Sequence, residues 1–264
     1  VQPDNYRGIH LTAQLSTVVE RLLKQLYDPY LSSVSAFGPS QFAFTLLERG
    51  AQDAPALLVL TWIKALGTGR KVAVYCSDVS SAFDRVRAER RSETEEERTP
   101  RKSCRGVGVM VARTLCPNSC RGNDVQVDDP QEHGVPGVAG PTLWNLFFED
   151  ARHAINECFY KEVVFADDLN AYRIYPSAIQ NSAITQSLDN CQRELHKWGN
   201  ATRVAFDATK ECQHVLSTSD PEGSAFKLLG VPFDTELSMA NAVSESVSSA
   251  GWKLRTLLRT RRFY

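Results

Sequence analysis

Apolar residues recur at helical spacing in two segments near the start of the chain. Between residues 12 and 26 they fall three or four positions apart with polar residues between them, which predicts an amphipathic helix (Leu15, Val18, Val19, Leu22, Leu23 and Leu26). Residues 53–66 repeat this pattern, with Asp53 as the N-cap, Pro55 in the first turn and Gly67 after the last. We expect both helices to pack on the same core.

Short runs of β-branched and aromatic residues predict strands further along. Residues 71–76 form one such run, bounded by glycine before it and an acidic residue after it. Residues 163–166 and 169–174 form two more, which Asp167 and Asp168 join. The second and third strands therefore predict a hairpin with two carboxylates at its tip.

Helical spacing alternates with strand-like segments in the second half of the chain. The helices are expected at residues 141–159 and 184–198, and the strand-like segments at residues 203–206, 213–216 and 226–233. The order of strand, helix, hairpin, helix and strand predicts an α+β fold. In that fold an antiparallel sheet is covered by helices on one face.

One segment, residues 89–138, follows neither period. It is rich in charged residues, glycine and cysteine, and its apolar residues form only a short island at residues 107–115. Two interpretations stay open: a surface insertion or disordered linker, or a stretch translated out of frame.

Composition describes an ordinary globular chain. Its 264 residues are 42% hydrophobic and 23% charged with a formal net charge of -1, so any nucleic-acid contact must use local basic groups, such as those after residue 252 (Lys253, Arg255, Arg259, Arg261 and Arg262). The seven irregularly spaced cysteines and the absence of an apolar leader favour an intracellular protein, nuclear or cytoplasmic and not secreted. No run is long and apolar enough to predict a membrane segment. The chain starts at Val1 as if inside a domain, which predicts a fragment.

The strongest candidate chemistry is carried by carboxylates. Asp78 directly follows the strand at 71–76, and Asp167 and Asp168 stand at the hairpin tip. Clustered carboxylates repel one another unless cations compensate them, and oxygen ligands suit hard divalent ions such as Mg²⁺. Two such ions about 3.5 to 4 Å apart support phosphoryl transfer. A single acidic pair is common in turns, so the wider motif set decides.

That motif set resembles the reverse transcriptases of non-LTR (LINE-like) retrotransposons over nearly the whole chain. The opening N-Y-R block at residues 5–7, the Q-x-x-F block at residues 41–44 and the D-x-x-x-A-F-D block at residues 78–84 match in order. The F-A-D-D block at residues 165–168 is the most specific match, and a tryptophan followed by a lysine at position 210 and an L-G turn at residues 229–230 complete the series.

The resemblance implies an RNA-directed DNA polymerase that extends a primer 3′-hydroxyl. Asp78, Asp167 and Asp168 would hold two Mg²⁺ or Mn²⁺ ions, and Lys210 would be the cation near the triphosphate. It also places Phe83, Arg7 and Asn145 on the nucleotide and template side (Asn145 in the motif at residues 134–145). The implied partners are an RNA template, a DNA primer and deoxynucleoside triphosphates, while the oligomeric state is undetermined.

The resemblance also implies a domain order. Residues 1–70 would form partial fingers, residues 71–235 a right-hand palm, and residues 236–264 the start of a truncated thumb. Two departures bear on substrate positioning: Thr45 stands where the family has arginine, and the loop at residues 136–141 is two residues short.

Other functions are less well supported. The pair Cys116 and Cys120 lacks a second histidine at the spacing of a zinc finger, and neither a P-loop nor a G-x-G-x-x-G dinucleotide motif occurs. Two alternatives stay open beside the polymerase: a non-catalytic, nucleic-acid-binding retrotransposon remnant, and a cyclase-like palm enzyme. The blocks near Asn5 and Gln41 argue against the cyclase.

Overall fold

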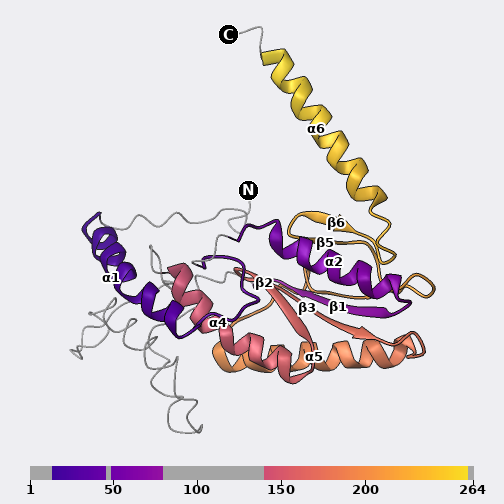
Figure 1. Ribbon diagram of the computed structural model, residues 1–264, viewed down its shortest axis with the longest axis horizontal. Helices are drawn as coiled ribbons and strands as arrows, with labels where there is room; N and C mark the ends of the chain where they lie inside the picture. Colours follow the sequence, from indigo (N-terminus) through magenta and orange to yellow (C-terminus); the bar gives the residue numbers. More distant parts are fainter. Residues whose placement is uncertain (1–13, 46–48, 80–139, 261–264) are drawn as a thin grey trace, which may run out of the picture.

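The computed structural model describes residues 14–45, 49–79 and 140–260, and the irregular segment at 89–138 lies outside these ranges (Figure 1). Within them, four strands form an antiparallel sheet in the order β2-β3-β1-β4. The strands are β1 (Lys71–Ser77), β2 (Lys161–Phe165), β3 (Asp168–Tyr175) and β4 (Cys212–Leu216). Every residue of β1 is buried, which explains its continuous apolar run: the strand is central and both of its faces are covered.

Alternate residues of β1 supply two separate cores. Ala73 and Tyr75 point to one face, where α4 (Gly140–Glu157) and α5 (Asn181–Thr202) pack. Val72 and Val74 point to the other face, where α2 (Asp53–Gly67) packs through the fully buried Trp62. Figure 1 shows α2 on one side of the strands and α4 and α5 on the other.

This arrangement confirms the α+β class but corrects one expectation. Helices cover both faces of the sheet, not one, because both sets of β1 side chains are apolar and each needs a partner layer. The first helix, α1 (Gln14–Ser33), does not share the core of α2; its Tyr27 and Leu31 pack with Leu143 at the start of α4.

A second prediction, the strand at residues 203–206, is wrong. Helix α5 runs four residues beyond Trp198 to Thr202, and Arg203, whose φ of 61° is left-handed, caps it. The Val204 amide donates to the Gly199 carbonyl at 2.9 Å. Gly199 is needed here because a Cβ would lie 2.7 Å from the Val204 carbonyl oxygen. Only Phe206 then makes a bridge, to Val79.

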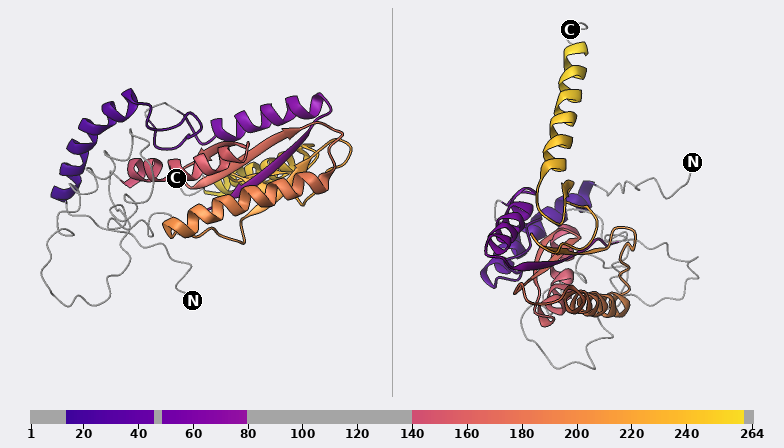
Figure 2. Two further views of the ribbon diagram at one scale, coloured as in Figure 1. Left: turned by 90° about the horizontal axis from the view of Figure 1, so that it is seen from below. Right: turned by 90° about the vertical axis from the view of Figure 1, so that its right-hand side faces the viewer.

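The last elements lie on the α2 side of the sheet. Strands β5 (Phe226–Leu228) and β6 (Val231–Phe233) form a hairpin whose turn residues, Leu229 and Gly230, both have positive φ, as a type I′ turn requires. Helix α6 (Ala240–Thr260) follows and extends away from the sheet (Figure 2). Among the described helices, none has the length and apolar character needed to cross a bilayer.

Candidate active site

The three carboxylates named by the sequence lie at one edge of the sheet. The register between β1 and β3 ends with Ser77 opposite Leu169, so Asp78 follows at the level of Asp168. Asp167 occupies the turn that joins β2 to β3. Long-range pairing of strands more than 90 positions apart therefore gathers the carboxylates that the motifs only named.

The arrangement of the three carboxylates changes the pKa of Asp168. Partial burial, followed by the negative charges of Asp78 and Asp167, raises the pKa of Asp168 from 3.8 to about 6. Lys210 acts in the opposite direction, and a hydrogen bond to Asp78 favours the protonated form of Asp168. The edge thus holds more negative charge than its protein surroundings compensate.

Lys210 also lies at this edge of the sheet. Its ammonium donates a short hydrogen bond to Asp78 Oδ2 and lies 3.8 Å from Asp207 Oδ2. The hydrogen bond to Asp78 raises the pKa of Lys210. The Asp207 amide donates to the Asp78 carbonyl at 3.0 Å, which ties the turn that carries Lys210 to the end of β1.

Gln41 holds the hairpin tip from the other side. Its Oε1 accepts hydrogen bonds from the amides of Ala166 (3.2 Å) and Ala43 (3.0 Å), and its Nε2 donates to the Ala166 carbonyl at 3.5 Å. Trp144 Nε1 donates to the same carbonyl at 3.1 Å. Ala166 has a left-handed φ of 60°, so these bonds stabilise a backbone conformation that alanine adopts only at a cost. Gln41 thereby positions Asp167.

Asn145, expected on the nucleotide side, is buried. Its Nδ2 donates to the Ala43 carbonyl at 2.9 Å, while its Oδ1 has no hydrogen-bond partner among the described residues. The side chain therefore orders the segment that follows Gln41. The other two residues expected on the nucleotide and template side, Arg7 and Phe83, lie outside the described residues.

Sequence reasoning missed one residue, Glu211, beside Lys210. Its side chain is only 7% exposed, and Oε1 accepts a short hydrogen bond from Tyr75 and lies 3.5 Å from the Ser77 hydroxyl and 2.8 Å from His196 Nε2. Its Oε2 accepts from Gln192 at 3.3 Å. The carboxylate thus anchors the Lys210 turn to β1 and α5. The available signal was the alternation of β1, which turns Tyr75 and Ser77 toward α5.

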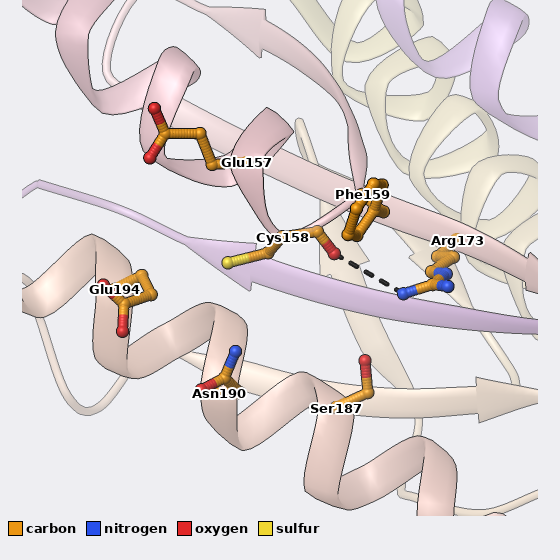
Figure 3. Close-up of a pocket in the computed structure, with 7 residues that line it drawn as sticks. All are labelled: Glu157, Cys158, Phe159, Arg173, Ser187, Asn190 and Glu194. Carbon is orange, nitrogen blue, oxygen red and sulfur yellow. Dashed lines mark hydrogen bonds between the residues drawn. The ribbon is translucent and has the colours of Figure 1, made fainter.

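The carboxylate edge and the described cavity lie in different parts of the molecule. Within residues 14–45, 49–79 and 140–260, no three His, Cys, Asp or Glu side chains converge closely enough to hold a metal ion, and Asp78 is paired with Lys210. A cavity of about 400 Å³ lies at the far end of the β2–β3 hairpin, where Arg173 donates to the Cys158 carbonyl at 3.5 Å (Figure 3). The carboxylates themselves stand at the sheet edge, away from this cavity.

An antiparallel sheet with carboxylates at a hairpin tip, and helices behind it, defines a polymerase palm. The chain matches the family model of reverse transcriptase (RNA-dependent DNA polymerase) over residues 2–233, and it therefore belongs to the reverse transcriptase family. This match confirms the expectation of a reverse transcriptase with a palm fold. The comparison with curated proteins gave no match.

Two telomerase structures are similar to the chain. Apo telomerase from Candida tropicalis, truncated from its C-terminal domain, is 12% identical with a TM-score of 0.49 over 83% of this chain and 44% of that one. Telomerase from Candida albicans, in complex with the TWJ fragment of telomeric RNA, is 12% identical with a TM-score of 0.43 over 85% of this chain and 36% of that one. The chain spans less than half the length of either telomerase chain.

Replacing Gln41 should destabilise the protein. Gln41→Ala leaves the buried Ala166 amide without its partner, which should lower the free energy of unfolding by about 1 to 3 kcal/mol in urea. The exposed Gln52, whose side chain makes no cap bond to α2, is the matched control, and Gln52→Ala should change this value by less than about 0.5 kcal/mol. Equal effects of the two substitutions would contradict the role of the Gln41 hydrogen bonds in holding the hairpin tip.

Replacing Asp168 should stabilise the protein in a pH-dependent way. Because the folded-state pKa of Asp168 is raised, its contribution to stability is fully present below about pH 3.8 and is lost as the pH rises through about 6. Asp168→Asn should therefore raise the melting temperature above pH 6, and this gain should shrink toward pH 4. Asp189→Asn, at an exposed site on α5, should give no such trend. A gain that does not vary with pH would refute the electrostatic origin.

Proposed function

We propose that the chain catalyses RNA-directed DNA synthesis, extending the 3′-hydroxyl of a DNA primer on an RNA template with deoxynucleoside triphosphates. The observation that carries the proposal is the β1–β3 register, which puts Asp78 beside Asp168 at the tip that also bears Asp167. Membership of the reverse transcriptase family supports the choice of reaction.

The donor set at this edge fits two Mg²⁺ or Mn²⁺ ions. Asp78, Asp167 and Asp168 offer only carboxylate oxygens, which hard divalent ions prefer. Burial, and next the charges of Asp78 and Asp167, raise the pKa of Asp168, so a bound cation would offset a cost of ionising this carboxylate. Two bound ions would activate the primer hydroxyl and stabilise the leaving oxygen of pyrophosphate. We assign Asp78, Asp167 and Asp168 as the metal ligands on this basis.

The ion pair between Lys210 and Asp78 points to a role for Lys210. Its ammonium now neutralises Asp78, so a cation bound by Asp78 would release it toward the triphosphate. The side chain is 60% exposed and therefore free to reorient. While it is paired, the hydrogen bond to Asp78 raises the pKa of Lys210, so the side chain is a protonated ammonium when an ion displaces it. A protonated group can neutralise or protonate pyrophosphate. Glu211 would hold the turn that bears Lys210 in place while the ammonium moves from Asp78 toward the triphosphate.

The remaining assignments extend the family resemblance. We propose the non-LTR branch because of the ordered blocks from Asn5 to Lys210, with Arg7, Phe83 and Asn145 on the nucleotide and template side. Residues 1–70 would be fingers, 71–235 palm and 236–264 the start of the thumb. A nuclear or cytoplasmic location accords with this role.

One observation favours a second candidate, a palm that binds nucleic acid without catalysis. The Lys210–Asp78 ion pair occupies a proposed metal ligand, and the described carboxylates do not converge on a common point. In a non-catalytic remnant this pair would be permanent. The two candidates differ in whether divalent ions can displace Lys210.

Primer extension tests the catalytic proposal. The full chain, with an RNA template, a DNA primer and Mg²⁺ or Mn²⁺, should extend the primer, whereas Asp167→Asn with Asp168→Asn should lose at least about 10²-fold in rate because the metal ligands are neutralised. Asp189→Asn, which removes one negative charge from an exposed site on α5, should keep the wild-type rate. Equal rates for all three proteins would refute the assignment of Asp167 and Asp168 as metal ligands. A wild type that binds primer-template without extending the primer would favour the non-catalytic remnant.

Metal binding can be measured without turnover. Mg²⁺ at about tenfold its dissociation constant should stabilise the wild type by about 1.4 kcal/mol, since it binds only the folded edge. Asp168→Asn should abolish most of this shift, while Asp189→Asn should retain it. A shift that persists in Asp168→Asn would place the ion elsewhere.

A further inference from the structure

Two cysteines face each other across the ladder that joins β1 to β4. Cys76 of β1 is paired directly with Cys212 of β4 in the antiparallel register. Both thiols are free, and Cys76 is buried while Cys212 is partly exposed. Alternation places both side chains on the α2 face of the sheet, in the same core cluster as Val74.

The spacing of such a pair suits a disulfide. Directly opposed residues of an antiparallel ladder have Cα atoms about 4.5 to 5.5 Å apart. A disulfide spans Cα separations of about 4.4 to 6.8 Å, so the two thiols can join without moving the strands. The two thiols also lie close enough that Cys76 is the largest influence on the pKa of Cys212.

His214 completes this cluster on the same face of β4. It is 3% exposed and stacks on Phe226, with ring centroids 4.2 Å apart and planes 16° from parallel. Neither of its ring nitrogens has a hydrogen-bond partner among the described residues, although Cys212 lies beside it. The hydrogen bond from Cys76, and next the contact with His214, lower the pKa of Cys212 to about 5 against the opposing effect of burial. Cys212 is therefore the reactive thiol of the pair.

We propose that Cys76 and Cys212 are a reversible oxidation site that closes to an intramolecular disulfide in response to peroxide. The Cys212 thiolate attacks a peroxide oxygen, the O–O bond breaks, and hydroxide leaves to give a sulfenic acid. The Cys76 sulfur then attacks Cys212 Sγ, the S–O bond breaks, and water leaves with the proton of Cys76. Two thiols and one hydrogen peroxide thus give one disulfide and two waters, and a dithiol reductant reverses the change.

A second thiol pair provides an internal contrast. Cys158, at the end of α4 (Figure 3), interacts with Cys191 of α5, which is fully buried. Burial raises the pKa of both thiols, and no histidine contributes. Both pairs therefore bring two thiols close together, but of these four cysteines only Cys212 has a lowered pKa, which stabilises its thiolate. Peroxide should select the β1–β4 pair.

The position of the pair gives its oxidation a structural consequence. In the described sheet β4 is the edge strand next to β1, and its outer side makes a single bridge, between Val215 and Glu222. The turn that bears Lys210 leads into β4. A covalent link at Cys212 would hold this edge strand against fraying. The amides of β4 should therefore exchange more slowly in the oxidised protein.

Peptide mapping of the full chain tests the site and does not depend on the proposed function. Reduced protein is treated with an equimolar amount of hydrogen peroxide, its remaining thiols are alkylated, and its peptides are identified by mass. We expect a Cys76–Cys212 cross-linked peptide, lighter by two hydrogen atoms than its parts and removed by dithiothreitol. Cys158→Ser should form it as the wild type does, and Cys212→Ser should not. A different first cross-link, or unchanged alkylation of both cysteines, would overturn the proposal.

A second variant tests the order of attack. Cys76→Ala removes the thiol that resolves the sulfenic acid, so Cys212 should accumulate a dimedone adduct under the same oxidant. The wild type should show little of this adduct because Cys76 closes the disulfide. A dimedone adduct confined to other cysteines of Cys76→Ala would refute Cys212 as the reactive thiol.

Discussion

The antiparallel register between β1 and β3 is the constraint on which the candidate active site depends. Pairing runs from Lys71 with Tyr175 to Ser77 with Leu169, so Asp78 and Asp168 meet at one edge of the sheet. A slip of one residue would exchange the two faces of β1, turning Val74 toward α5 and Tyr75 toward α2. The two cores resist such a slip, and the register that brings the carboxylates together is thereby stabilised by apolar packing.

The carboxylate edge is stable because its surroundings offset local costs. Burial and then repulsion raise the pKa of Asp168, and Lys210, which is paired with Asp78, acts in the opposite direction. Strain appears in the left-handed backbone of Ala166, which Gln41 and Trp144 hold with hydrogen bonds. Such uncompensated charge on a rigid support is typical of sites that bind cations.

The β1–β4 ladder carries different chemistry on its two faces. On the α5 face, the buried Glu211 carboxylate joins Tyr75 of β1 to the turn that bears Lys210. On the α2 face, Cys76 and Cys212 stand opposite each other beside His214. Both features flank β1, which ends directly before Asp78, so the ladder physically connects the thiol pair to the carboxylate edge.

The sequence alone determined the elements with a strong local period and named the three carboxylates that lie at the sheet edge. The helix near residues 53–66, the strand at 71–76 and the carboxylate hairpin all form as expected, and the family is confirmed by the match over residues 2–233. These features were predictable because periodicity and short motifs are properties of neighbouring residues.

Only the tertiary structure decided what each element packs against. The second helical layer on the sheet, the loss of the strand at residues 203–206 to a longer α5, and the partners of Gln41 and Glu211 all depend on contacts between distant segments. No local sequence pattern specifies which buried polar groups will form hydrogen bonds with each other. That pairing is set by the joint packing of the sheet and its two helical layers, because each buried donor must find an acceptor where the fold brings one.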